Sequence, residues 1–170
     1  MHFRKPAHLL SAAAAFALVI GASAPPWAAT PSDTLVIADK IDDIVSIDPA
    51  ESFEFSGNDM LNNVYDTLVE LDPMDLGPLV PGLATDWSLA DDGVTYTFTI
   101  REGVKFHSGN DLTAEDAAWS LQRAVILDKT PSFILDQFGF TAENVAEKIK
   151  ATGDYELTIV TDKPYAPSFF

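Results

Sequence analysis

A strict alternation of apolar and polar residues in the middle of the chain restricts its fold more than any other feature. From Val94 to Ile100 every second residue is aliphatic or aromatic, and the residues between them are threonines. The alternation follows Asp91-Asp92-Gly93, which is typical of a tight turn, and Trp87 and Leu89 precede that turn. We therefore predict a β-hairpin with one buried face, which needs a further layer to cover it.

Two segments combine a helix start signal with apolar residues at helical spacing. Thr113 and Asp116 have the spacing of a capping box ahead of a helix that should end near Leu127, and Ser56 and Asp59 repeat that spacing. The elements predicted in chain order are a strand over 34–38, an irregular acidic loop over 39–55, a helix over 57–68, a Pro- and Gly-rich boundary over 73–82, the hairpin over 87–100, helices over 113–127 and 141–150, and a strand over 155–160.

The amino terminus predicts export. Arg4 and Lys5 precede twelve uncharged residues from Leu9 to Ile20, a run shorter than the roughly 20 residues of a membrane span. We expect a signal peptide over residues 1–29, cleaved after Ala28 or Ala29, and a periplasmic protein. No lipid anchor is expected, because the chain has no cysteine.

Charge and composition exclude several functions. The chain has 10 Lys and Arg against 26 Asp and Glu, a formal charge of -16 at pH 7, whereas binding of nucleic acid requires a cationic surface. His107 is the one histidine that remains beyond the leader, and no phosphate loop or nucleophile motif is present. We therefore expect no enzyme activity, no catalytic residue, no metal, no cofactor and no nucleic-acid partner.

Three stretches in a fixed order carry a family resemblance. They are Ser46-Ile47-Asp48-Pro49-Ala50 followed by Asn63-Val64-Tyr65-Asp66-Thr67-Leu68, then residues 79–87, then residues 96–109 with 112–116. The sequence resembles the family 5 extracellular solute-binding proteins, which are receptors of ABC importers for peptides, nickel and related solutes. The third stretch is the most specific, because it joins a strand, a turn and a capped helix without interruption.

The resemblance implies an α/β fold of the two-lobed, periplasmic-binding-protein type II-like kind, of which this chain would hold part of lobe I and its extra α+β subdomain. The implied limits are residues 30–65 for the first segment of lobe I, 66–163 for the extra subdomain and 164–170 for the return to lobe I. The chain stops on Phe169-Phe170 without a polar tail. We expect an amino-terminal fragment of a longer receptor, and the alternative is a small domain whose last residues dock on its core.

The implied function is a periplasmic receptor that binds oligopeptides or dipeptides, delivers them to permease subunits in the inner membrane and is monomeric when complete. Nickel, opines and oligosaccharides are alternative solutes within the family. An exported hydrolase domain and a secreted scaffold are alternatives of other classes.

The resemblance also places the segment after Asp48-Pro49 near the solute cleft. In an extended segment Phe53 and Phe55 would face the same side, which fits either a ligand wall or a core. Glu54 between them would favour a cationic group such as a peptide amino terminus. Phe133, in the loop expected after the second helix, is the fourth candidate for ligand binding.

Overall fold

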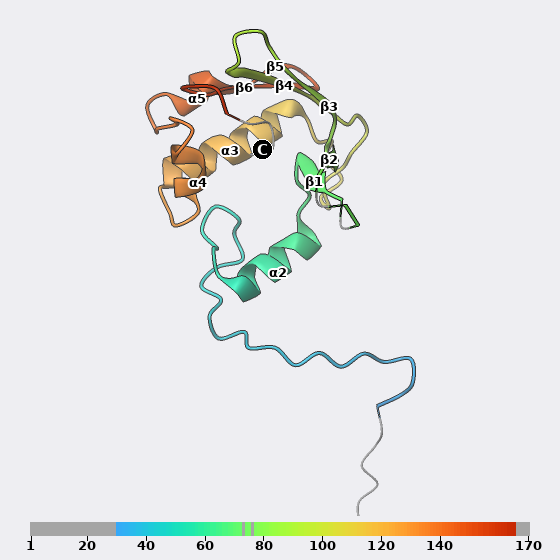
Figure 1. The fold of residues 1–170 in the computed structure, drawn as a ribbon. Coiled ribbons are helices and arrows are strands. Elements are labelled where there is room, and N and C mark those ends of the chain that lie inside the picture. The colour runs from blue at the N-terminus through green and yellow to red at the C-terminus, as the bar shows by residue number, and fades with distance from the viewer. Residues whose placement is uncertain (1–29, 73, 76, 166–170) are drawn as a thin grey trace, which may run out of the picture. The chain divides into compact units, whose positions relative to one another are not determined.

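The computed structural model describes residues 30–72, 74–75 and 77–165, and the chain divides into two units, residues 1–38 and 39–170. The predicted signal peptide over 1–29 and residues 166–170 of the predicted return segment lie outside the described residues. The helices and strands of the described residues all belong to the second unit (Figure 1).

Residues 30–38 of the first unit form neither helix nor strand, so the strand predicted over 34–38 is wrong. A strand is stabilised by ladder hydrogen bonds to a neighbouring strand, but the Thr34 N–H donates to the nearby Pro31 carbonyl at 3.0 Å. The apolar side chains of Leu35, Val36 and Ile37 are 83%, 69% and 77% exposed. An apolar run alone is therefore not sufficient to form a strand here.

The described residues of the second unit form four helices and six strands. In chain order they are α2 Phe55–Val64, β1 Val69–Leu71, β2 Leu79–Pro81, β3 Ala84–Leu89, β4 Thr95–Ile100, α3 Ala114–Leu127, α4 Ser132–Asp136, α5 Val145–Lys148, β5 Ile149–Gly153 and β6 Glu156–Val160.

The predicted hairpin is confirmed and forms part of a larger sheet. Strands β3 and β4 pair antiparallel, and the full order is β3-β4-β6-β5. Phe98 lies opposite Trp87 on one side and opposite Leu157 on the other. Tyr96, Phe98 and Ile100 are at most 2% exposed, as the alternation predicts. The sheet therefore buries the face that the sequence marks as apolar.

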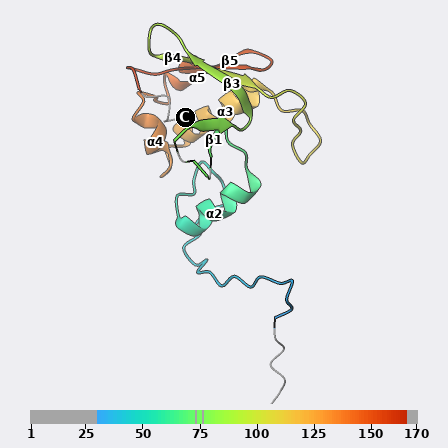
Figure 2. The same ribbon diagram turned by 45° about the vertical axis from the view of Figure 1, so that its right-hand side comes forward.

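Helix α3 covers this sheet and has the limits that the sequence predicts (Figure 1, Figure 2). The capping box is present, because the Asp116 carboxylate accepts hydrogen bonds from the backbone N–H and the hydroxyl of Thr113, at 2.8 and 2.9 Å. Ala114, Ala118 and Val125 are buried in the cluster that the sheet residues form. Helix and sheet thus share one core.

Three predictions of local structure need correction. The helix expected over 141–150 is reduced to α5, because Ile149 is fully buried and pairs with Ile159 as the first residue of β5. Helix α2 begins at Phe55 and ends at Val64, before the predicted limit at residue 68. The Ser56 hydroxyl donates to the Lys40 carbonyl at 2.7 Å and does not cap α2.

The structure also adds elements that were not predicted. Strands β1 and β2 pair antiparallel, and β2 lies inside the Pro- and Gly-rich segment over 73–82. Helix α4 follows α3 after a short turn. None of the helices in the described part of the chain has both the length and the apolar composition needed to cross a membrane.

Candidate functional site

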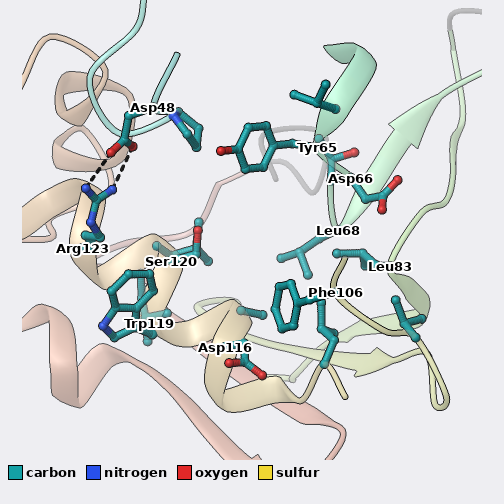
Figure 3. Close-up of a pocket in the computed structure, with 18 of the residues that line it drawn as sticks. Asp48, Tyr65, Asp66, Leu68, Leu83, Phe106, Asp116, Trp119, Ser120 and Arg123 are labelled. Atoms are coloured by element: carbon teal, nitrogen blue, oxygen red, sulfur yellow. Dashed lines mark hydrogen bonds and ion pairs between the residues drawn. The ribbon is translucent and has the colours of Figure 1, made fainter. Parts of the chain in front are cut away.

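A pocket of about 1100 Å³ opens beside α3 in the second unit (Figure 3). Its walls come from α3, from the carboxyl end of α2 with the residues that follow it, from the loop at residues 46–49 and from the loop at 104–107. Tyr65, Leu68, Phe106 and Trp119 give it large apolar and aromatic surfaces. Charged side chains also belong to the lining, among them Asp48, Asp116 and Arg123. Apolar walls combined with placed polar groups are typical of sites for organic ligands.

An ion pair crosses the edge of this pocket. Arg123 on α3 donates from both terminal nitrogens to the two oxygens of Asp48, at 2.8 and 2.6 Å, and Figure 3 shows the two groups facing each other. Both side chains are 31% exposed. The guanidinium also lies 5.7 Å from the centre of the Trp119 ring. The hydrogen bonds from Arg123 hold the pKa of Asp48 below its ordinary value, so the pair stays ionised.

Asp48 also organises the loop that contains it. Its carboxylate accepts the Ala50 N–H at 2.9 Å, and its carbonyl accepts the N–H groups of Glu51 and Ser52, each at 2.9 Å. The Asp48 N–H in turn donates to the Ser46 hydroxyl at 3.1 Å. An aspartate that bonds the backbone two residues ahead is typical of a tight turn. The motif at residues 46–50 is therefore a closed turn fixed to α3.

Two of the predicted site residues lie together. The rings of Phe53 and Phe133 make an edge-to-face contact, with centres 5.1 Å apart and planes at 84°. Phe53 is 44% exposed and Phe133 is 52% exposed. Phe133 belongs to α4, which corrects its predicted place in a loop. The pair offers a partly exposed aromatic surface, and neither ring is among the residues that line the pocket.

The conformation of the chain at Phe55 differs from the prediction. It is the first residue of α2 and is 95% exposed, so the extended segment that contains Phe53 does not continue through Phe55. The reason for expecting both rings on one side is therefore wrong. Neither Phe53 nor Phe55 is buried by the described residues of this chain.

Glu54 precedes α2 and is held by its neighbours. One carboxylate oxygen accepts the Ser52 hydroxyl at 3.0 Å and the Phe53 N–H at 3.1 Å. Hydrogen bonds from its own backbone N–H, from Ser52 and from Phe53 hold the pKa of Glu54 below its ordinary value. Glu54 is therefore a fixed negative charge beside Phe53. Within the described residues, no group of three or more His, Asp or Glu side chains is placed to hold a metal ion.

Sequence reasoning found the loop but missed the ion pair that fixes it. Asp48 was selected only as part of a family motif, and Arg123 was not selected at all. No local pattern joins two residues that lie on a loop and on a helix far apart in the sequence. The one available signal was the spacing of Trp119 and Arg123, which places both on the same face of α3.

Comparisons of the sequence with known proteins show which family it matches. Residues 78–170 match the model of the bacterial extracellular solute-binding proteins, family 5 Middle. The chain is 33% identical over 137 residues to the probable di/tripeptide-binding protein 5 of Pseudomonas aeruginosa, covering 73% of this chain and 25% of that protein. It is 32% identical over 125 residues to the nickel-binding periplasmic protein of Escherichia coli, covering 72% of this chain and 22% of that protein.

The fold comparison gives the same result. The structure of the murein tripeptide binding protein MppA of Escherichia coli matches with a TM-score of 0.61 and 27% identity, over 73% of this chain and 26% of that chain. The α/β fold described above thus corresponds to part of the two-lobed periplasmic peptide-binding proteins. This chain spans about a quarter of the length of these relatives. It belongs to the bacterial extracellular solute-binding proteins of family 5.

Proposed function

We propose that the protein serves as part of a periplasmic solute receptor of an ABC importer and that its solutes are oligopeptides or dipeptides. The observation that carries this proposal is the aromatic pair of Phe53 and Phe133 beside the fixed carboxylate of Glu54. Support also comes from the relatives, since P. aeruginosa proteins named as di/tripeptide-binding are among them.

The chemistry of these residues suits a peptide. Covering a partly exposed aromatic ring with an apolar side chain of the solute is favourable by about 1 to 3 kcal/mol for a ring that becomes fully buried. The ionised Glu54 attracts a cationic group, such as the amino terminus of a peptide. Phe55 is included in the proposed ligand wall because it adjoins Glu54 and is exposed.

We place the solute receptor in the periplasm, exported by a signal peptide over residues 1–29, and we propose permease subunits of the inner membrane as its partners. Residues 30–65 would form the first segment of lobe I, 66–163 the extra subdomain and 164–170 the start of the return to lobe I. The concentration of buried side chains between residues 69 and 165 supports a separate subdomain there. Monomeric behaviour is part of the same proposal.

Calorimetric titration of the full-length receptor would test the proposal. The panel contains dipeptides, tripeptides, their N-acetylated forms and Ni²⁺. We expect the free peptides to bind, Phe53→Ala and Phe133→Ala to weaken that binding, and Glu54→Gln to weaken free peptides more than acetylated ones. Leu89→Ala is the control, because Leu89 is a partly exposed apolar residue of β3 (39% exposed) and is not among the residues that line the pocket. Binding of Ni²⁺ without any peptide would reject the proposed solute.

A further inference from the structure

Three of the residues proposed above to face the solute, Phe53, Glu54 and Phe55, lie in a segment with few buried apolar side chains. Residues 39–54 form a loop without helix or strand, and Phe53 and Glu54 lie at its end. Helix α3, by contrast, is anchored by buried Ala118 and Val125. Arg123 extends from this anchored helix to the loop, and its partner there is Asp48.

A short series of hydrogen bonds leads from Asp48 to the proposed solute site. The Asp48 carbonyl accepts the Ser52 N–H at 2.9 Å. The Ser52 side chain is 2% exposed, and its hydroxyl donates to Glu54 at 3.0 Å. The same Glu54 oxygen accepts the Phe53 N–H at 3.1 Å. The orientation of both site residues therefore depends on the turn that Asp48 closes.

The form of the ion pair adds a geometric requirement. Two parallel N–H···O bonds fix the carboxylate in the plane of the guanidinium, which a single charge does not achieve. Loss of one partner would leave the other charge partly buried without its counterion, and this is unfavourable. The loop would then lose the fork that fixes its turn to α3.

We propose that Arg123 is a positioning residue of the solute site, which holds the Asp48 turn so that Phe53 and Glu54 face the solute. It does not touch the solute itself. The proposal rests on the proposed function for the role of Phe53 and Glu54, but the effect of Arg123 on the position of Phe53 is independent of any solute.

The test uses the full-length receptor and two measurements. The first is the affinity for the tripeptide phenylalanyl-alanyl-alanine, measured by calorimetry. The second is the ¹⁹F resonance of a fluorinated phenylalanine placed at position 53, measured without peptide. Phe133→Ala calibrates the resonance, because it removes the ring that contacts Phe53.

The variants are Arg123→Met, Arg123→Lys and Asp48→Asn, with Arg101→Met as the matched control. Arg101 is exposed and donates to the Gly82 carbonyl at 3.0 Å, away from the loop. We expect Arg123→Met to move the resonance and to weaken tripeptide binding about tenfold, which corresponds to the loss of one good interaction. Lysine keeps the charge but not the fork, so Arg123→Lys should give an intermediate result. Asp48→Asn provides the same test if Arg123→Met does not fold.

The outcomes separate this proposal from the proposed function. An unchanged resonance in Arg123→Met and Asp48→Asn, whatever their stability, overturns the positioning role. A shifted resonance with unchanged tripeptide affinity overturns it as well. If the unmodified receptor binds no peptide, the proposed function fails, and the resonance alone decides whether Arg123 positions Phe53.

Discussion

Two parts of the second unit differ in how they are held together. Residues 69–165 share one cluster of buried side chains, formed by the four-stranded sheet and α3. Residues 39–65 contain only Ala50 and Leu61 as buried apolar residues in the described structure. Most of their large apolar side chains are exposed, namely Ile41, Val45, Ile47, Phe53, Phe55, Met60, Val64 and Tyr65. Burial stabilises the later part, whereas a few polar and aromatic contacts position the earlier one.

The largest effect should come from the core of the later part. Phe98→Ala removes a ring that is 2% exposed and pairs with both neighbouring strands, so we expect a loss of about 3 to 5 kcal/mol in the free energy of unfolding. The control, Phe55→Ala, removes an exposed ring and should change that free energy by about 0.5 kcal/mol or less. Urea denaturation of both variants measures the contrast. Equal losses of unfolding free energy in the two variants would mean that burial stabilises both parts to the same extent.

The part that the sequence predicts well is the part with this core. The alternation from Val94 to Ile100 and the capping box of Thr113 are local patterns, and burial in the same fold reinforces them. The segment 141–150 has an equally local helical pattern, but Ile149 is used as a strand residue because β6 offers it a partner. Local periodicity therefore predicted the hairpin and α3, and it failed at Ile149, where pairing with β6 competed with the helix.

The earlier part was harder to predict for a physical reason. Its contacts join residues that are distant in sequence, such as Asp48 with Arg123 and Phe53 with Phe133. No periodicity encodes such contacts. The sequence identified three of the four aromatic and acidic site candidates by their place after the Asp48 motif, but it could not show that Phe55 begins a helix.

A second prediction concerns the close approach of α2 to the loop. Gly57 lies in α2, and a Cβ placed there would be 2.2 Å from the Ser52 hydroxyl oxygen. Glycine to alanine in an open helix is stabilising by up to about 1 kcal/mol. Here we expect Gly57→Ala to lower the free energy of unfolding by about 1 to 3 kcal/mol, because the added group is overpacked.

The double variant Gly57→Ala with Ser52→Ala removes the contact that causes this clash. It should recover part of the stability measured by urea denaturation, although the hydrogen bond from Ser52 to Glu54 is lost. A stabilised Gly57→Ala protein would show that α2 is not packed against the loop at this point.

A third prediction measures the aromatic contact between the loop and α4. A double-mutant cycle of Phe53→Ala and Phe133→Ala should give a coupling free energy of about 0.5 to 1.5 kcal/mol, the range for edge-to-face pairs. We expect the lower end of this range, because both rings are partly exposed. A cycle of Phe53→Ala with Phe106→Ala is the control and should be additive. Additivity in both cycles would remove the ring contact as a link between the two parts.

The smallest effect should be the pH dependence of the link between Asp48 and Arg123. The pKa of Asp48 lies below its ordinary value of 3.8, first because of the hydrogen bonds from Arg123 and also because of the Ala50 N–H. A carboxyl whose pKa is lower in the folded chain stabilises the fold above its ordinary pKa, and this contribution disappears as the pH falls through the folded value. Asp48→Asn should therefore lower the unfolding midpoint at neutral pH and lose its effect in acid, below 3.8.

The measurement is the thermal midpoint against pH for the unmodified protein, for Asp48→Asn and for Asp59→Asn, an exposed carboxyl on α2. The charges of Glu51 and Tyr65 also act on Arg123. Asp43 and Glu54 have lowered pKa values in the same loop, so the unmodified protein and Asp48→Asn should both lose stability in acid. The informative quantity is the difference between the Asp48→Asn curve and the unmodified curve, which should shrink as the pH falls. The Asp59→Asn curve should follow the unmodified protein throughout. A constant difference for Asp48→Asn would show that Asp48 acts through the turn it closes and not through its charge, because only the charge is titrated.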